Sequence, residues 1–185
     1  MMITTVQKIT TDEHFQMFTE CYNREFGDNF LSADFLRGCE EVYLFFNSEG
    51  NAVAGYSINV HQPYRVLNVA PEVVAQHLRA KATGKITYEL GTIWIEKSRR
   101  NGREKLELWL HIFGKMLSRS DTVMVGATES REIFHFYERY GMKIAYFGPL
   151  FVHGEQTSDA WVVYSDDISN SKVPEMYEAL KKRLA

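Results

Sequence analysis

One region constrains the fold of this chain more than any other, and it spans residues 85–128. Residues 85–97 are a candidate for a long strand with an apolar run at 92–95, and residues 121–128 form a short apolar strand candidate. Between them, residues 104–118 carry apolar side chains at helical spacing, which predicts an amphipathic helix. A strand, a helix and a second buried strand in this order predict a βαβ unit within a parallel or mixed sheet.

The segments on either side predict the rest of that sheet. Residues 42–46 and 53–60 are rich in β-branched and aromatic residues and are joined by turn residues, which predicts an antiparallel hairpin. Thr11 predicts the cap of a first helix, because Asp12 and Glu13 follow it. Further strands are predicted at 2–9 and in two runs after residue 141, and further helices at 32–40, 71–80, 129–141 and 173–184. The predicted class is α/β or α+β, with helices on both faces of a mixed sheet.

Length and composition limit the classes of protein to consider. With 185 residues, 45% of them apolar, the chain suits a single domain spanning residues 1–185. Its net charge of −3 gives no general attraction to nucleic acid or to an anionic membrane. There is no charged-then-apolar leader and no apolar run of about 20 residues, so we expect a cytoplasmic protein. Neither its two cysteines nor its six histidines show metal-ligand spacing, so no metal is expected.

A basic loop, "SRRNGR" at residues 98–103, lies between the predicted strand and helix of the βαβ unit. The start of a helix has backbone N–H groups without partners and the positive end of the helix dipole, and both attract anions. Arginine can donate two hydrogen bonds to one phosphate, and a glycine lets a ligand approach the backbone closely. The loop is therefore a candidate site for the phosphates of a nucleotide-like ligand. The alternative is an ordinary basic turn with solvated arginines.

The glycine pattern excludes the two best-known phosphate motifs. The chain contains no G-x-x-x-x-G-K-[ST] sequence and no G-x-G-x-x-G sequence. Ser98 is not part of the G-x-S-x-G elbow of hydrolases. A phosphate ligand at this loop would therefore bind in a different way from that of P-loop or dinucleotide-binding proteins.

Two motifs and the order of the elements resemble the GNAT superfamily of N-acyltransferases. The family's pyrophosphate loop has the form [RQ]-x-x-G-x-[GA] between a long fourth strand and a helix, and Arg99 and Gly102 match its first two fixed positions. A later helix in the family carries a tyrosine in a pattern like F/L-Y-x-x-x-G-[FM], which Phe136, Tyr137 and Gly141 match. The resemblance implies a central mixed sheet of six to seven strands flanked by helices on both faces.

The resemblance also implies a reaction and a donor site. The reaction is transfer of an acyl group from acyl-CoA, with acetyl-CoA as the first choice, to an amine that attacks directly. The residues implied in donor binding are Arg99, Arg100, Asn101, Gly102, Arg103 and Glu104, with the backbone of Ile93, Trp94 and Ile95 for the pantetheine arm.

Two residues are candidates for the proton transfers of this reaction. In the family the tyrosine lies near the thioester sulfur, so Tyr137 is the candidate acid, and a phenol with a pKa of about 10 can donate to a departing thiolate. The alternative is that Tyr137 is one aromatic residue of a packed helix face. Glu89 is the candidate base, because apolar neighbours on a strand disfavour the charged form of a carboxyl group. The alternatives are that Glu89 is solvated or pairs with a cation, with Glu96 as the rival carboxylate.

Glu104 departs from the family pattern, which has glycine or alanine at that position. A carboxylate there would crowd or repel a pyrophosphate, which leaves two alternatives open. One is a donor on an acyl carrier protein, whose phosphopantetheine arm has one phosphate, and the other is a non-catalytic binding module. The strand also resembles the E-x-x-R-x-x-V strand of long-chain acyltransferases related to homoserine-lactone and N-acyl amino acid synthases, with Glu89 in the acidic position and Thr92 in place of arginine.

The leading hypothesis is therefore an N-acyltransferase of GNAT type acting on a small-molecule amine. The connection at residues 61–84 is long for a link between strands, and such loops often carry function, so we expect it to select the acceptor. By analogy with the family, a homodimer is the expected assembly. An acyl carrier protein is the second partner to test, and no nucleic-acid or membrane partner is expected.

Overall fold

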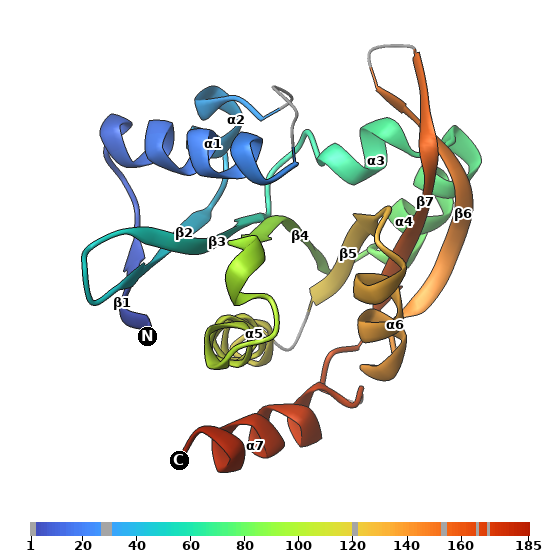
Figure 1. The fold of residues 1–185 in the computed structure, drawn as a ribbon. Coiled ribbons are helices and arrows are strands. Elements are labelled where there is room, and N and C mark those ends of the chain that lie inside the picture. The colour runs from blue at the N-terminus through green and yellow to red at the C-terminus, as the bar shows by residue number, and fades with distance from the viewer. Residues whose placement is uncertain (1–2, 27–30, 120–121, 153–154, 166, 170) are drawn as a thin grey trace. The chain divides into compact units, whose positions relative to one another are not determined.

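The structure is a computed structural model that describes residues 3–26, 31–119, 122–152, 155–165, 167–169 and 171–185 (Figure 1). Its contacts divide the chain into two compact units. The first unit comprises Met1–Asn59, Leu90–Ile112 and Leu180–Ala185, and the second comprises Val60–Glu89 and Phe113–Ala179. One strand and two helices contribute residues to both units. The single domain expected from the sequence stays a prediction.

The first unit is built around the predicted hairpin. Its elements are β1 (Ile3–Lys8), α1 (Asp12–Phe26), α2 (Ala33–Arg37), β2 (Glu41–Asn47), β3 (Ala52–Asn59), the second part of β4 (Ile86–Ile95), the short 3-10 turn η1 (Lys97–Arg99), most of α5 (Arg103–Leu117) and the end of α7 (Val173–Leu184). Thr11 accepts a hydrogen bond from the backbone of His14, as the predicted cap requires. Ser32 caps α2 in the same way, through the backbone N–H of Phe35.

Helices pack on both faces of the strands in this unit. The ring of Phe18 on α1 meets Trp94 of β4 edge-on at 5.9 Å. On the opposite face, Tyr56 of β3 shares a hydrogen bond of 2.8 Å with His111 of α5. Side chains alternate between the two faces along a strand. On β3, Gly55 therefore faces Phe18 and Trp94, and its neighbour Tyr56 faces His111.

The second unit follows the same layered plan. Its elements are α3 (Arg65–Val69), α4 (Glu72–Lys81), the first part of β4, the end of α5, β5 (Thr122–Thr128), α6 (Arg131–Arg139), β6 (Lys143–Val152), β7 (Glu155–Ser165) and most of α7. Val162 of β7 is buried in a core with Leu67 of α3 and Leu78 of α4. The preceding residue of the strand, Trp161, stacks at 4.8 Å on Phe134 of α6, on the other face.

The strands follow the order β1-β2-β3-β4-β5-β7-β6, which confirms the predicted mixed sheet of six to seven strands flanked by helices. β1 to β3 pair antiparallel, as do β5 with β7 and β6 with β7. β4 and β5 pair in parallel, from Ile86 with Thr122 to Glu89 with Val125, which confirms the βαβ unit. The ends of several elements differ from the sequence prediction by a few residues, and two differences matter for the site. The long strand ends at Ile95, two residues early, and α3 was not predicted.

Gly55 lets β3 approach α1 closely. A Cβ atom at this position would lie 2.5 Å from Nε1 of Trp94, 2.7 Å from the ring of Phe18 and 2.9 Å from the carbonyl oxygen of Tyr43. Real Cβ contacts are longer than these, so a side chain here would displace two large buried rings. The position of Trp94 on β4 therefore depends on a glycine in the neighbouring strand.

Gly55→Ala should lower the free energy of unfolding by about 1–3 kcal/mol, because it overpacks a rigid core. Gly91→Ala is the matched control, since its Cβ would lie 3.7 Å from Oγ of Ser57, an ordinary contact. Urea denaturation of the two variants checks this, and the control should stay within about 1 kcal/mol of the parent protein. Equal stability of the two variants would contradict the close packing described for Gly55.

Candidate functional site

The basic loop is a compact turn between β4 and α5. The backbone N–H of Arg99 donates to the carbonyl of Glu96 at 2.8 Å, and that of Gly102 donates to the carbonyl of Arg99 at 3.0 Å. These two bonds close successive turns, and α5 then starts at Arg103. The loop therefore delivers the chain directly into a helix start, where backbone N–H groups lack helical partners.

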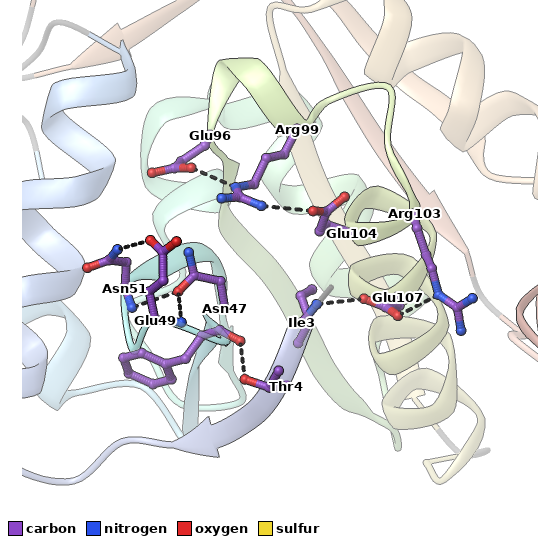
Figure 2. Close-up of polar contacts among 11 residues, drawn as sticks. Ile3, Thr4, Asn47, Glu49, Asn51, Glu96, Arg99, Arg103, Glu104 and Glu107 are labelled. Atoms are coloured by element: carbon purple, nitrogen blue, oxygen red, sulfur yellow. Dashed lines mark hydrogen bonds and ion pairs between the residues drawn. The ribbon is translucent and has the colours of Figure 1, made fainter. Parts of the chain in front are cut away.

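Arg99 is held inside the loop by two carboxylates. Its Nε atom lies 2.8 Å from the carboxylate of Glu96 and its Nη1 atom lies 2.8 Å from that of Glu104 (Figure 2). The side chain of Arg99 is only 16% exposed and that of Glu104 only 8% exposed. The hydrogen bond to Glu96, and then that to Glu104, raise the pKa of the Arg99 guanidinium. The first arginine of the family motif is therefore already paired with anions of its own chain.

Glu104 also uses the space that Gly102 leaves open. A Cβ atom on Gly102 would lie 2.5 Å from Oε2 of Glu104. The sequence suggested that this glycine admits the close approach of a ligand, and in the structure a carboxylate of the same chain lies there. The residue that departs from the family pattern thus folds back over the glycine that matches it.

The other two arginines of the loop also have partners. Arg100 lies 3.4 Å from the carboxylate of Glu25 on α1 and donates to the carbonyl of Ile95 at 3.4 Å. Arg103 lies 3.0 Å from Glu107, one turn along α5. Each arginine of the loop therefore pairs with a carboxylate, while the side chains of Arg100 and Arg103 are still 41% and 49% exposed. Both interpretations of the loop, as a phosphate site and as a basic turn, stay hypotheses. Glu25 was missed from the sequence, since it lies about 75 residues away.

A pocket of about 470 Å³ opens beside the loop within the first unit. It is lined by Arg100, Asn101, Gly102, Arg103, Lys105, Leu106, Arg183 and Leu184. Arg103 fixes its far wall by donating to the backbone carbonyl of Leu184 at 2.8 Å. Within the described part of the chain, Lys105 and Arg183 form no ion pair. Arg183 was not predicted, because nothing local in the sequence links the end of α7 to a loop some 80 residues earlier.

The end of β4 carries the predicted pantetheine contacts and a strained residue. The side chain of Trp94 is fully buried in the core, whereas Ile93 and Ile95 are half-buried. Thr92 has a φ of 45°, which is uncommon for any residue except glycine and costly for a β-branched one. Its buried hydroxyl donates to Oγ of Ser57 at 2.7 Å. The hydrogen bond between Thr92 and Ser57 was not predicted from the sequence. Its one local signal there is the Gly91–Thr92 pair between apolar residues.

Glu89, the candidate base, lies in the second unit and is 4% exposed. Its carboxylate accepts hydrogen bonds from the backbone N–H groups of Arg65 at 3.0 Å and Val66 at 2.5 Å. These are the first N–H groups of α3, whose N-cap residue Tyr64 supplies no side-chain cap. Glu89 therefore caps α3 and ties the 61–84 connection to β4. Its role as a base stays a hypothesis.

Tyr137, the candidate acid, is 4% exposed on α6 of the second unit. Ser130 caps this helix through the backbone of Ile133, and the helix ends before Gly141, whose φ of 81° suits glycine. Burial raises the pKa of the Tyr137 phenol above its ordinary value. The phenol therefore stays protonated at neutral pH, in the form that can donate.

The predicted acceptor segment has a pocket of its own. A volume of about 280 Å³ in the second unit is lined by Gln62, Pro63, Tyr64, Leu67, Asn68 and Arg79. The hydroxyl of Tyr64 donates to the carbonyl of Val60 at 2.8 Å, and Arg79 pairs with Glu72 at 3.1 Å. The pocket thus combines amide, aromatic and cationic groups on the connection that Glu89 anchors.

The described residues contain no group of three or more His, Cys, Asp and Glu side chains that could hold a metal ion. Across the same part of the chain, no helix combines the length and the apolar character that crossing a membrane needs.

Comparison with known proteins identifies solved structures with a similar fold. No family model and no curated protein sequence matches the chain. Among solved structures, FeeM, an N-acyl amino acid synthase from uncultured soil microbes, is similar with a TM-score of 0.67 and 12% identity, over 90% of this chain and 91% of that one. The Arabidopsis thaliana protein Naa50, in complex with the bisubstrate analogue CoA-Ac-MVNAL, is similar with a TM-score of 0.62 and 11% identity, over 88% and 99%.

A GCN5-related N-acetyltransferase from Brucella melitensis gives a TM-score of 0.60 with 11% identity, over 97% of this chain and 81% of that one. The chain has the GNAT fold. This confirms the resemblance drawn from Arg99, Gly102 and the Tyr137 helix. At 11–12% identity, the structural similarity shows the fold alone. The roles of the site residues are therefore inferred from their geometry in this chain.

Glu89→Ala should lower the free energy of unfolding by about 1–3 kcal/mol, because two N–H groups of α3 lose a charged acceptor. Glu72→Ala removes a carboxylate from an exposed pair with Arg79 and should change stability by less than about 1 kcal/mol. Chemical denaturation of both variants tests this. A Glu89 variant as stable as the Glu72 variant would show that the cap on α3 contributes nothing.

Proposed function

We propose that this protein is an N-acyltransferase that moves an acyl group from acyl-CoA, with acetyl-CoA as first choice, to an amine. The observation that carries the proposal is the strand–turn–helix of β4, η1 and α5, with a cationic pocket at the start of α5, in a chain of GNAT fold. The similar structures are an N-acyl amino acid synthase and N-acetyltransferases, one of them bound to a CoA-containing bisubstrate analogue. These support acyl transfer to nitrogen as the reaction.

The donor would bind along the first unit. Its phosphates would lie in the pocket beside Arg100, Asn101, Gly102 and Arg103, where Lys105 and Arg183 add cations without ion-pair partners among the described residues. The backbone of Ile93 and Ile95 would hold the pantetheine arm, as a strand holds an added strand.

The chemistry needs only a few groups of the chain. The amine nitrogen attacks the thioester carbonyl carbon, forming a C–N bond and a tetrahedral oxyanion. The C–S bond then breaks, the amide forms, and the thiolate takes the phenolic proton of Tyr137. The proton released by the amine passes to Glu89 or to water and finally restores the phenol. Burial raises the pKa of the phenol, so it keeps its proton until the thiolate departs but is a weaker acid than a solvated tyrosine.

The acceptor would be selected by residues 61–84, which line the pocket of about 280 Å³. That volume is at the small end for a ligand pocket, so a small amine fits better than a folded protein. Glu89 holds this segment in place through α3. Its anchoring role is independent of whether it also accepts the amine proton.

One observation favours a second candidate donor, an acyl thioester on an acyl carrier protein. Glu104 pairs with Arg99 and lies over Gly102, and this reduces the room and the charge for a diphosphate. A phosphopantetheine arm has one phosphate and therefore needs less room and less positive charge at the loop.

A homodimer and a cytoplasmic location stay predictions from the sequence.

Calorimetric titration with acetyl-CoA and with a long-chain acyl-CoA, at moderate salt, tests the proposal. We expect saturable binding of at least one, followed by transfer to an amine in an acceptor screen. Binding of only the long chain would favour a lipid-type synthase. If neither thioester nor an acyl carrier protein bound, the chain would be a non-catalytic module and the proposal would fail.

The pocket cations give a direct prediction. Lys105→Ala combined with Arg183→Ala should weaken acyl-CoA binding by up to about fivefold, since exposed charge pairs contribute 1 kcal/mol or less. The control is Lys181→Ala combined with Lys182→Ala. It also removes two positive charges, both from α7, the helix that carries Arg183, and neither residue lines the pocket. Equal weakening by both pairs would remove Lys105 and Arg183 from the donor site.

Tyr137→Phe should lower turnover by about 10²-fold with little change in donor affinity, because it removes the acid and keeps the ring. Tyr140→Phe, a change to another buried tyrosine close by, is the matched control and should leave turnover near the parent value. Steady-state kinetics with the best amine check both. In the parent protein, ionisation of this phenol should not reduce turnover below about pH 10. Unchanged turnover in Tyr137→Phe would remove it from the acid role.

A further inference from the structure

We infer that Glu104 is a specificity-determining residue, which withholds Arg99 from the donor so that recognition rests on the pantetheine arm and the diphosphate contributes little. The inference rests on the proposed function, since it concerns the donor of that same reaction. It assigns a role to the one residue that departs from the family loop.

Three observations place Glu104 in competition with a bound phosphate. Its carboxylate lies 2.8 Å from Nη1 of Arg99, the distance at which a phosphate oxygen would bind an arginine. The same carboxylate lies 2.5 Å from where a side chain on Gly102 would begin, so it takes the space that this glycine leaves. Glu104 is 6% exposed, which means that solvent does not screen the pair as it screens surface pairs.

The charges in this group oppose a diphosphate. Arg99 carries +1, and Glu96 and Glu104 carry −1 each, so the three side chains sum to −1. A diphosphate approaching them would have to displace a carboxylate from Arg99 before it gained an ion pair. The displaced carboxylate would then lose a buried charged partner, which is costly.

The other charges around the loop do not reverse this balance. Arg100 and Arg103 face the outer pocket, but each already pairs with a carboxylate, Glu25 and Glu107 respectively. Only Lys105 and Arg183 line that pocket without an ion pair in the described part of the chain. The outer pocket can therefore receive a phosphate weakly, while the inner position beside Arg99 stays filled.

The first test uses the unaltered protein and three donors that share one acyl group: acyl-CoA, S-acyl-4′-phosphopantetheine and S-acyl-pantetheine. Calorimetry should give dissociation constants for the three donors that lie within about tenfold of one another. A tenfold range corresponds to about 1.4 kcal/mol of binding free energy. A preference of a hundredfold or more for acyl-CoA would overturn the inference and leave the proposed function standing.

The second test changes the residue. Glu104→Gln keeps the shape and removes the charge, and Glu104→Ala also opens the space over Gly102. Both should tighten acyl-CoA binding, by about ten- to a hundredfold in the alanine variant, and leave S-acyl-pantetheine unchanged. Thermal melting of each variant shows whether it is folded before the titrations are compared.

Glu107→Gln is the matched control, since it removes the same charge one turn along α5 from a carboxylate that also pairs with an arginine of the loop. Its pair is more exposed, at 49% and 20% for the two side chains, so acyl-CoA binding should change by no more than about threefold. Equal gains in the Glu104 and Glu107 variants would indicate a general charge effect and overturn the inference. Absence of binding by all three donors, and by an acyl carrier protein, to every variant would instead overturn the proposed function.

Discussion

Burial of β4 is the constraint on which the rest of the structure depends. Apart from Ile86, the strand is buried or half-buried along its length, so partners within the protein stabilise the polar groups that it carries, with Nε1 of Trp94 as an exception among the described residues. Glu89 accepts hydrogen bonds from the first N–H groups of α3, and Thr92 donates one to the hydroxyl of Ser57. Glu96, just past the strand, forms an ion pair with Arg99. Each of these partnerships holds a segment to which we assign a function.

The same principle explains the basic loop. A run of arginines at a helix start would carry a high local charge, and here that charge is compensated from within the chain. Four carboxylates pair with the three guanidiniums: Glu96 and Glu104 share Arg99, Glu25 pairs with Arg100, and Glu107 pairs with Arg103. The ion pairs connect the loop to α1 and to the first turns of α5. Under the proposed function, donor affinity would then depend on groups that stay accessible.

The fold was largely predictable from the sequence, because its long elements repeat apolar residues at clear periods. The βαβ unit, the hairpin and the cap at Thr11 follow from local patterns. α3 was missed because it is short and its cap comes from Glu89, more than 20 residues away. No local pattern could reveal that partnership.

The candidate site was predictable in its residues and less so in their partners. Arg99, Gly102 and Tyr137 stand out in the sequence, but their environments depend on long-range packing. Glu104 could be identified as a departure from the family pattern, whereas its ion pair with Arg99 needed coordinates. Arg183 lines the pocket beside the loop, where Arg103 also binds the carbonyl of Leu184 at the end of α7. Composition and periodicity carry no information about such contacts.

The central claim is that the chain transfers an acyl group to nitrogen, and a single-turnover experiment tests it most directly. The protein would be mixed with acetyl-CoA labelled with ¹³C in the acetyl group and with a pool of small amines, and the products would be resolved by mass spectrometry. The account predicts that the label appears on the nitrogen of at least one amine, faster than without protein, as free thiol is released. Bound donor whose label never leaves sulfur, or leaves it only as acetate, would contradict the account.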